Sequence, residues 1–273
     1  MTIKEISEAL NVSISTVSKA LNDATDIAED TKAKIREYAE SVGYHLKAKK
    51  QPLKRICAIY ERVDSDTRNN VLYHVVASFS DVAIANNFEV MIDYVVAKPS
   101  DFNLNDYLVQ NNFCAAFIVG MNFKSRIYKQ IKQTTVPLVL LDNRFSDMPL
   151  IASVSSENTG AIVSAIKYLA KKGHAKIGFV MGEKDSQVSA ERLAGYISGL
   201  ARSGIEFNHD YIYYGDFTKT SGEEAAEYFS DTDVTAVISS SDIMAMGLID
   251  GFKACGKSVP DDVSVIGFDD LNL

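Results

Sequence analysis

Cysteine, tryptophan and proline are scarce in this chain of 273 residues, which has three Cys, no Trp and five Pro. The three cysteines, Cys57, Cys114 and Cys255, are odd in number and far apart, so the sequence predicts neither a disulfide framework nor a zinc site. No apolar run is long enough to span a membrane, and charged residues such as Lys4 and Glu5 interrupt any signal peptide. We therefore expect a cytoplasmic protein without a metal or other cofactor.

Negative charge is missing from one stretch of an otherwise acidic chain. The net charge is -8, but no Asp or Glu occurs between Ser41 and Tyr60. Five basic residues lie in that stretch: Lys47, Lys49, Lys50, Lys54 and Arg55. A basic patch on an acidic body indicates binding to a polyanion at one end of the molecule, although a charge run taken alone is also typical of a solvated linker.

The first 44 residues predict three short helices. A capping box of Thr and Glu places the start of the first helix near Ile3. The turn falls at residues 11–13, and the second helix follows at residues 14–21. A third helix is expected from about Glu29 to Val42, with Gly43 as its stop. This is a helix-turn-helix, whose second helix is suited to the major groove of DNA.

The outward face of the second helix carries the candidate DNA-binding residues. Residues at the start of a recognition helix meet base edges. Here Ile14 can contact a thymine methyl, Ser15 lies beside it, and Lys19 can donate to guanine. Short polar side chains suited to phosphates occur at four further positions: Thr2, Thr16, Ser18 and Asn22. The alternative is that these residues are merely exposed helix positions.

This segment resembles the headpiece of the lactose-repressor (LacI/GalR) family. The matching residues are Thr2 to Ile6, Val12-Ser13, Ser15 to Lys19, Leu21-Asn22, Thr31 and Gly43-Tyr44. The resemblance implies that Ile14, Ser15 and Lys19 occupy the family's base-reading positions. The sequence differs from the family at one of these positions, because the family usually has Arg where Lys19 stands. Lys lacks the rigid fork of a guanidinium.

Residues 45–55 are the weakest part of the resemblance. The family has a hinge helix here that inserts a Leu into the minor groove, but its usual sequence pattern is absent. Leu53 falls on the inserting position, directly after Pro52, which a helix tolerates only in its first turn. Either Leu53 still inserts, or the residues from Lys47 through Lys50 to Arg55 form an extended basic strap on the phosphates. We favour the strap.

From Ile56 onwards, apolar strands alternate with helices, which predicts parallel sheets. The alternation restarts near residue 150, so we expect two lobes, with a ligand crevice at the carboxyl ends of the strands. The expected strands span residues 56–60, 90–96, 115–120, 136–141, 151–155, 177–181, 211–214, 236–239 and 263–268. The expected helices span residues 71–85, 104–111, 125–132, 159–172, 190–203, 221–229 and 245–254.

The second cycle resembles the effector domain of the same family and the related type I periplasmic sugar-binding proteins. The matching pieces include Glu157-Asn158, Ser189 to Arg192, Gly215 to Phe217, Ser241-Asp242 and Gly267 to Asp270. The expected organisation is therefore a headpiece at 1–44, a basic hinge at 45–55 and a bilobed α/β domain at 56–273. Because the relatives continue for a few tens of residues, we expect this domain to be truncated at its C-terminus.

The resemblance also implies an effector site in the crevice. Asp142, Arg192, Ser241 and Asp269 fall on effector-contacting positions, and Phe217 falls where an aromatic ring stacks on the ligand in some members. Carboxylates and a guanidinium can pair with sugar hydroxyls, while an aromatic ring covers the apolar face of a sugar. Asp242 is equally well explained as a helix cap.

These features together predict a DNA-binding transcriptional repressor rather than an enzyme. A sugar or sugar phosphate bound between the lobes would shift the population of conformations and move paired headpieces relative to operator half-sites. Because one headpiece covers only one half-site, we expect a homodimer. One alternative is control by a protein corepressor, a phosphocarrier. The other is a sugar-processing enzyme, but no catalytic triad or glycine-rich phosphate motif supports it.

Overall fold

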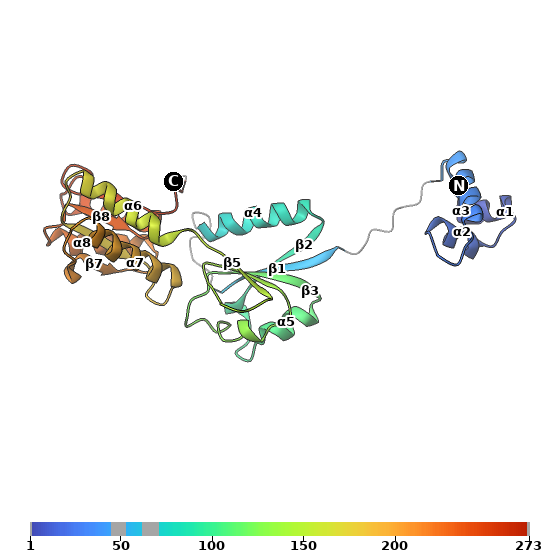
Figure 1. Cartoon of the computed structure of the whole chain (residues 1–273), viewed down its shortest axis with the longest axis horizontal. Coiled ribbons are helices and arrows are strands. Elements are labelled where there is room, and N and C mark those ends of the chain that lie inside the picture. Colours follow the sequence, from blue (N-terminus) through green and yellow to red (C-terminus); the bar gives the residue numbers. More distant parts are fainter. Residues whose placement is uncertain (1, 45–52, 62–70, 272–273) are drawn as a thin grey trace. The chain divides into compact units, whose positions relative to one another are not determined.

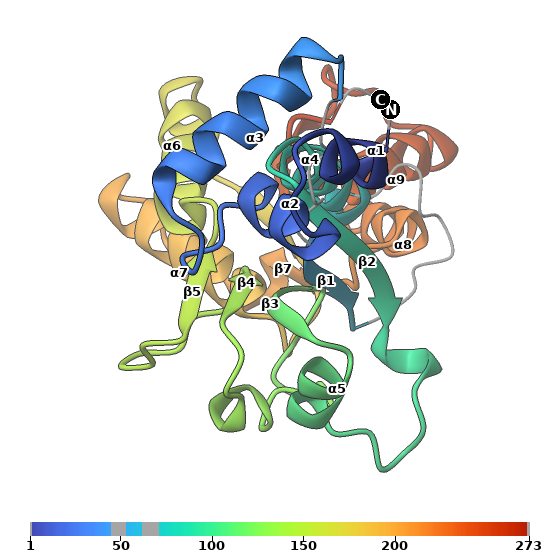
Figure 2. The ribbon, with the colours of Figure 1, turned by 90° about the vertical axis from the view of Figure 1, so that its right-hand side faces the viewer.

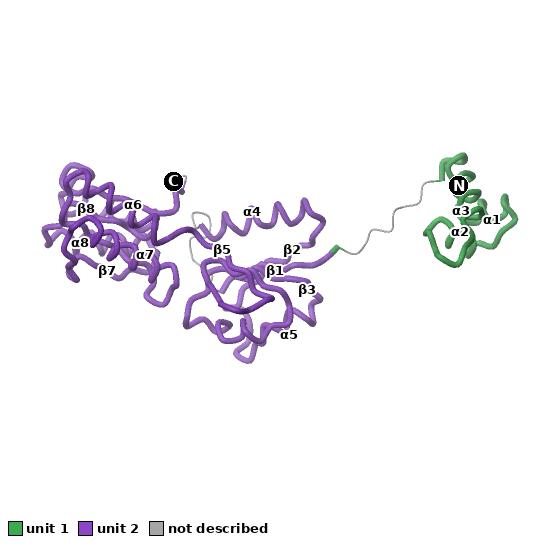
Figure 3. The backbone as a smooth tube through the Cα atoms, in the orientation of Figure 1, with its two compact units in different colours: residues 1–53 green, residues 54–273 purple. Residues whose placement is uncertain are grey.

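The protein forms two compact units, residues 1–53 and 54–273 (Figure 3). The structure is a computed structural model that describes residues 2–44, 53–61 and 71–271. Lys47 and Lys50, which we expected to contact DNA, lie outside the described residues. Each unit has its own hydrophobic core, so each is described by itself.

The first unit contains three helices, α1 (Ile3–Ala9), α2 (Ile14–Leu21) and α3 (Glu29–Ser41). They pack around a small core of Ile6, Val17, Ala20, Leu21, Ile35 and Ala39. The expected capping box is present, since Thr2 Oγ1 accepts from the Glu5 amide at 3.3 Å and Glu5 Oε2 accepts from the Thr2 amide at 2.7 Å. The expected start of α1 at Ile3 is confirmed, because a local hydrogen-bond pair sets it.

Local side-chain chemistry also sets the remaining boundaries of this unit. Asn11 takes a left-handed conformation, φ 51°, in the turn between α1 and α2. The hydroxyl of Ser13 then accepts from the Thr16 amide at 3.0 Å and caps α2. At the far end, α3 stops at Gly43, whose φ of +68° favours a residue without a Cβ. Both boundary expectations are confirmed.

The first lobe of the second unit is a five-stranded parallel sheet in the order β2-β1-β3-β4-β5. Its strands are β1 (Lys54–Tyr60), β2 (Phe88–Tyr94), β3 (Phe113–Val119), β4 (Leu138–Leu141) and β5 (Ile151–Val154). Its helices are α4 (Val71–Ala85), α5 (Leu104–Gln110) and the short 3-10 helices η1 (Val95–Ala97) and η2 (Ile131–Gln133). The α4 and α5 helices lie on opposite faces of this sheet (Figure 1).

The second lobe is a four-stranded parallel sheet in the order β7-β6-β8-β9. Its strands are β6 (Ile177–Met181), β7 (Ile212–Tyr214), β8 (Ala236–Ser239) and β9 (Ser264–Ile266). Its helices are α6 (Asn158–Lys171), α7 (Gln187–Arg202), η3 (His209–Tyr211), α8 (Lys219–Ser230) and α9 (Asp242–Ala254). Figure 2 shows α6 and α7 on one side of this sheet and α8 and α9 on the other, each pair with its own apolar cluster.

The helix pair α8 and α9 packs closely because glycines lie at its contact. A Cβ added to Gly222 would stand 2.1 Å from the Met244 carbonyl oxygen, and one added to Gly247 would stand 2.1 Å from the Lys219 carbonyl oxygen. Backbones this close exclude any side chain at both positions. None of the helices in the described part of the chain is long and apolar enough to cross a membrane.

One expected helix is wrong. Residues 125–132 form turns that lead into η2, where the sequence predicted an α-helix. The polar side chains of this stretch bind neighbouring loops: the Arg126 guanidinium donates to the carbonyls of Val95 and Pro99 at 2.7 and 2.9 Å. Gln130 accepts from the Leu104 amide at 2.7 Å. The segment is thus shaped by tertiary hydrogen bonds, which a periodic apolar pattern does not reveal.

Candidate DNA-binding and effector sites

The α2 helix has one buried face and one exposed polar face. Val17 and Ala20 are fully buried against the rest of the first unit, whereas Ile14 is 51% exposed. Ser15 and Lys19 are exposed beside it. This is the side-chain arrangement that a recognition helix needs, because the residues that could reach base edges take no part in the core.

Three of the polar side chains expected to contact phosphates are already hydrogen-bonded within the unit. Thr2 belongs to the capping box, and Thr16 Oγ1 lies 2.8 Å from Ser13 Oγ. Asn22 Nδ2 donates to the Ser18 carbonyl at 2.7 Å. A hydroxyl both donates and accepts, and an amide nitrogen carries two protons, so these groups keep capacity for a second partner.

Lys19 has a partner that the sequence did not suggest. Its Nζ lies 2.5 Å from Asp26 Oδ2, in the turn between α2 and α3. The hydrogen bond from Lys19 lowers the pKa of the Asp26 carboxyl, which keeps that group ionised. The neighbouring Asp23 is bound by Arg36 at 2.8 Å and Lys32 at 3.3 Å. Both carboxylates of this turn are therefore paired with cations.

Leu53, the last residue of the first unit, and Arg55, near the start of the second, have different environments. Leu53 directly precedes β1 and is 53% exposed, so its side chain is available to a partner. Arg55 lies inside β1, where its guanidinium donates to the Asn111 carbonyl at 2.7 Å and stacks 5.0 Å from the Phe113 ring centre. The expectation that Arg55 ends a basic strap is therefore not met, because this side chain anchors the sheet.

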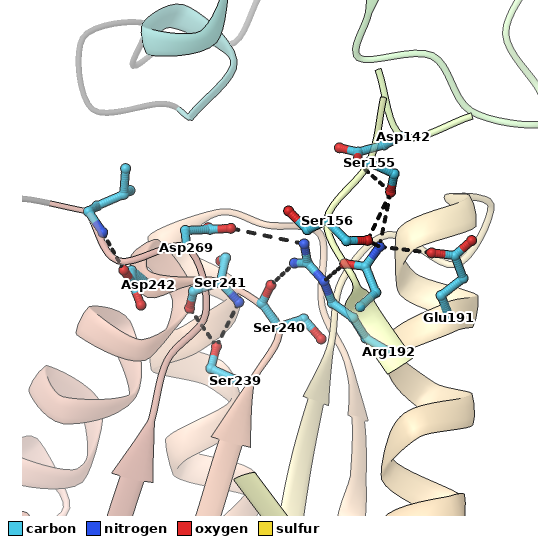
Figure 4. Close-up of polar contacts among 12 residues, drawn as sticks. Asp142, Ser155, Ser156, Glu191, Arg192, Ser239, Ser240, Ser241, Asp242 and Asp269 are labelled. Atoms are coloured by element: carbon cyan, nitrogen blue, oxygen red, sulfur yellow. Dashed lines mark hydrogen bonds and ion pairs between the residues drawn. The ribbon is translucent and has the colours of Figure 1, made fainter. Parts of the chain in front are cut away.

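Arg192 is the centre of the candidate effector site (Figure 4). It projects from α7 and is only 6% exposed. Its Nε donates to Asn158 Oδ1 at 2.9 Å, its Nη1 donates to the Ser240 carbonyl, and its Nη2 lies 4.0 Å from Asp269 Oδ1. The guanidinium also stacks 3.7 Å from the Phe268 ring centre. Burial lowers the pKa of Arg192, while the nearby carboxylates oppose that change.

Asp142 is joined to Arg192 through two intermediate side chains. It follows β4 with a left-handed φ of 61°, and its Oδ1 accepts from Ser155 Oγ at 3.0 Å. Asn158 Nδ2 donates to the same Ser155 oxygen at 3.3 Å (Figure 4). Because Asn158 also accepts from Arg192, Ser155 and Asn158 connect the Asp142 carboxylate to the guanidinium. Burial raises the pKa of Asp142. A residue of the first lobe thus shares one network with residues of the second.

Asp269 lies on the other side of Arg192 with an unusual backbone and an unusual acidity. Its φ is 118°, a conformation that costs free energy for a residue with a Cβ. Burial raises the pKa of its carboxyl to about 6, although Arg192 and the Asp242 amide act in the opposite direction. Strained backbone and shifted acidity at one position are common at binding sites.

Ser241 has a helix-capping role in the structure. It is the N-cap of α9, where its hydroxyl accepts from the Met244 amide at 3.2 Å. Asp242 is not the cap and instead accepts from the Leu271 amide at 2.8 Å. The neighbouring Ser240 was missed by sequence reasoning, yet its buried hydroxyl has no hydrogen-bond partner within the described residues. The signal for it was the run of three serines that begins with Ser239, the last residue of the buried strand β8.

Phe217 lies at the carboxyl edge of the same sheet, following β7. It is half-buried with φ 69°, and its ring covers Gly182, where an added Cβ would stand 2.0 Å from a ring carbon. No contact of Phe217 with Arg192 or Asp142 is seen in the described part of the chain. The structure therefore brings together Asp142, Arg192 and Asp269, with Phe217 at the same edge.

The lobes also touch through the loops that follow β3 and β6. Asn122 Nδ2 donates to Glu183 Oε2 at 3.0 Å, and Lys124 Nζ lies 2.6 Å from Asp185 Oδ2. These contacts were not expected from the sequence, because they join positions about sixty residues apart with no motif of their own. Among the described residues, no cluster of His, Cys, Asp and Glu is arranged to hold a metal ion.

Comparison with known proteins bears on the family and the fold of the chain. Residues 2–46 match the family described as "Bacterial regulatory proteins, lacI family", and residues 166–273 match "Periplasmic binding protein-like domain". The whole chain is 31% identical to "Probable HTH-type transcriptional repressor ExuR" of Bacillus subtilis and covers 83% of it. It is 28% identical to the repressor CytR of Escherichia coli and covers 81% of it. The solved complex of the regulator CelR with cellobiose superposes with a TM-score of 0.71 at 24% identity, over 99% of this chain and 83% of that one.

Proposed function

Because this chain belongs to the lacI family of bacterial regulatory proteins, we propose that it is a repressor of a carbohydrate operon that binds operator DNA through α2 and is controlled by a sugar-like effector in its crevice. The observation that carries the DNA-binding part is the exposed set of Ile14, Ser15 and Lys19 on a helix whose other face is buried. Ile14 would contact a thymine methyl, and Lys19 would donate to guanine.

The same proposal assigns phosphate contacts to Thr2, Thr16, Ser18 and Asn22. Their short polar side chains fix the register of the headpiece on the duplex without reading sequence. Leu53 is exposed and free to insert into the minor groove, while Lys47 and Lys50 would add charge to the phosphate contacts.

The effector part of the proposal depends on the network around Arg192. Asp142, Arg192 and Asp269 offer two carboxylates and one guanidinium with fixed orientations, and Phe217 offers an aromatic face at the same sheet edge. Such a set matches a molecule with several hydroxyl groups and an apolar ring face. The solved relative CelR binds a sugar, cellobiose, on the same fold.

Binding in the crevice would act on DNA affinity through the lobes. The Asp142 network and the loop contact between Asn122 and Glu183 both join the first lobe to the second. An effector that prefers one arrangement of the lobes shifts the population towards it, by as much as its affinities for the two states differ. In a homodimer this shift changes how the two headpieces meet adjacent half-sites.

Control by a small molecule is better supported than control by a protein corepressor, because Asn158, the Ser240 carbonyl and Asp269 surround the Arg192 guanidinium with polar groups. A regulator of this kind needs no catalytic activity of its own, and it acts in the cytoplasm where the operator is. Turnover of a glycoside by the purified protein would contradict this part of the proposal.

The experiment that tests the function is selection of bound duplexes from a random pool, with and without a panel of neutral sugars, sugar phosphates and nucleosides. We expect enrichment of one palindromic sequence, and release or tightening of that duplex by one class of compound. Retention of all duplexes alike, at low ionic strength and with every compound, would contradict the proposal.

A further inference from the structure

The headpiece is acidic, which is unusual for a unit that binds a polyanion. Residues 1–44 contain five Lys/Arg against eight Asp/Glu, a net charge of -3. Non-specific DNA binding depends on cations that neutralise phosphates and release counterions. The first unit therefore begins with little electrostatic attraction for an arbitrary duplex.

Most of its cations are also paired within the unit. Four of the five make ion pairs among the described residues: Lys4 with Glu8, Lys19 with Asp26, Lys32 with Asp23 and Glu29, and Arg36 with Asp23. The Lys32 side chain is only 5% exposed, so its pairs serve the packing of the turn. Lys19 is different, because it stands on the exposed face of α2.

The pair of Lys19 and Asp26 lies at the surface rather than in the core. The two side chains are 49% and 57% exposed, so neither is needed to fill space, and Nζ lies 2.5 Å from Oδ2. Asp26 has no other cation within ion-pair distance in the described part of the chain. Lys19 is therefore the direct partner of this carboxylate, and Lys32 acts on it only at longer range.

We propose that Asp26 is a specificity-determining residue that withholds Lys19 from phosphates and releases it only to a matching base edge. This inference rests on the proposed DNA-binding surface. Moving Lys19 from Asp26 to a phosphate replaces one solvated ion pair by another, and it leaves a bare carboxylate facing the DNA backbone. Such an exchange gains little.

A guanine in the major groove offers a different exchange. Its O6 and N7 are two acceptors in a partly dehydrated groove, where hydrogen bonds from a cation are stronger than at the surface. A duplex with a guanine at the matching position therefore compensates for the loss of the Lys19–Asp26 ion pair, while an arbitrary duplex does not. By this mechanism Asp26 lowers affinity for the wrong duplexes more than for the right one.

The test is Asp26→Asn in the full chain, with binding measured on a pool of random duplexes of about 30 bp and on the duplex recovered by selection. We expect non-specific affinity to rise about fivefold or more, with a salt slope steeper by about 0.9 per headpiece, because Lys19 becomes free for a phosphate. Affinity for the selected duplex should rise less, so the ratio of the two affinities should fall.

Two further variants distinguish the effect of losing the Lys19–Asp26 ion pair from the effect of changing the net charge of the headpiece. Glu40→Gln removes the same charge from α3, at a site with no ion pair in the described residues, and should change non-specific affinity by less than about twofold. Lys19→Met added to Asp26→Asn should abolish the gain. Equal effects of Asp26→Asn and Glu40→Gln, or an Asp26→Asn variant with unchanged non-specific affinity and salt slope, would overturn the inference.

The two proposals fail in different ways in this experiment. The preference of the unmodified protein for the selected duplex tests the proposed function and does not depend on Asp26. The difference between the unmodified protein and Asp26→Asn on random duplexes tests the role of Asp26. Circular dichroism of each variant confirms that the helices of the headpiece are retained.

Discussion

Arg192 shows how a single residue can hold several parts of the effector site together. Its guanidinium donates to Asn158 on α6 and to the Ser240 carbonyl after β8, and it lies beside Asp269 after β9. A planar guanidinium can make these contacts at once, whereas an ammonium group is a single point donor. The position therefore depends on geometry as well as on charge.

We predict that Arg192→Lys destabilises the second unit by about 2 kcal/mol, because a buried acceptor is left without its donor. Urea unfolding followed by Tyr fluorescence measures the loss. Arg202→Lys is the matched control, since Arg202 is exposed at the end of the same helix and should change stability little. A similar effect of both substitutions would contradict this assignment.

Asp269 predicts a pH dependence of stability. Its folded-state pKa of about 6 lies above the ordinary value of 3.8, so above pH 6 the folded protein carries a buried charge at a cost. The folded state binds the proton more tightly than the unfolded state, so lowering the pH from about 7 to about 4 stabilises the unmodified protein relative to Asp269→Asn.

This change should amount to about 2–3 kcal/mol across that window, from a shift of roughly two units. Parallel denaturant titrations of the two proteins at several pH values measure it. A difference in stability that stays constant with pH would show that the Asp269 carboxyl titrates normally.

At the scale of helices and strands, the sequence predicted most of the fold because the relevant physics is local. The capping box at Thr2, the cap at Ser13 and the stop at Gly43 each involve residues within a few positions of one another. The strands are short apolar runs that a parallel sheet buries on both faces. The failure at residues 125–132 has the opposite cause, since Arg126 and Gln130 bind loops that are distant in sequence.

The contact of α8 with α9 gives a prediction at the same scale. Gly222→Ala should destabilise the second unit by about 1–3 kcal/mol, because its Cβ would meet the Met244 carbonyl and the helices would have to separate. Gly160→Ala in α6 is the control: its Cβ would meet only the flexible Glu157 side chain, and alanine favours the helix by about 1 kcal/mol. Thermal unfolding of the two variants should therefore shift in opposite directions.

The recognition helix gives a further prediction at this scale. Ile14→Ala should weaken binding to the selected duplex about tenfold, since it removes an apolar contact from the groove, while leaving the salt slope unchanged because no charge is altered. Fluorescence anisotropy at several salt concentrations measures both quantities. An equal loss on random duplexes would indicate that Ile14 supports the fold of α2 instead of reading a base.

At the scale of the whole molecule, the sequence predicted which residues form the candidate site but not the hydrogen bonds that connect them. Asp142, Arg192 and Asp269 were assigned through the family resemblance, and the structure brings them together. Asn158, which joins Asp142 to Arg192 through Ser155, was named only as part of a matching motif, and the contact of Asp26 with Lys19 was not expected. Contacts between residues far apart in the chain, or between two surface charges, leave no periodic or motif signal to read.

The proposed homodimer gives a prediction at this scale. On the α4 helix, Val82 is 64% exposed and lines an apolar groove of about 310 Å³ together with residues such as Phe79 and Phe117. Val82→Asp should weaken self-association about tenfold or more, because it places a charge in the lining of this mostly apolar groove. Sedimentation equilibrium measures this, with Tyr168→Ser on α6 as an exposed control that should leave association unchanged.

The acidic headpiece also bears on how fast such a regulator finds its target. A chromosome offers on the order of a million or more non-specific positions for each operator, so the time spent bound at non-specific positions determines how long the search for the operator takes. A reading helix whose lysine is held by its own aspartate dwells only briefly at each of them. Fewer copies of the protein then keep the operator occupied, and the cell obtains tight control from a scarce molecule.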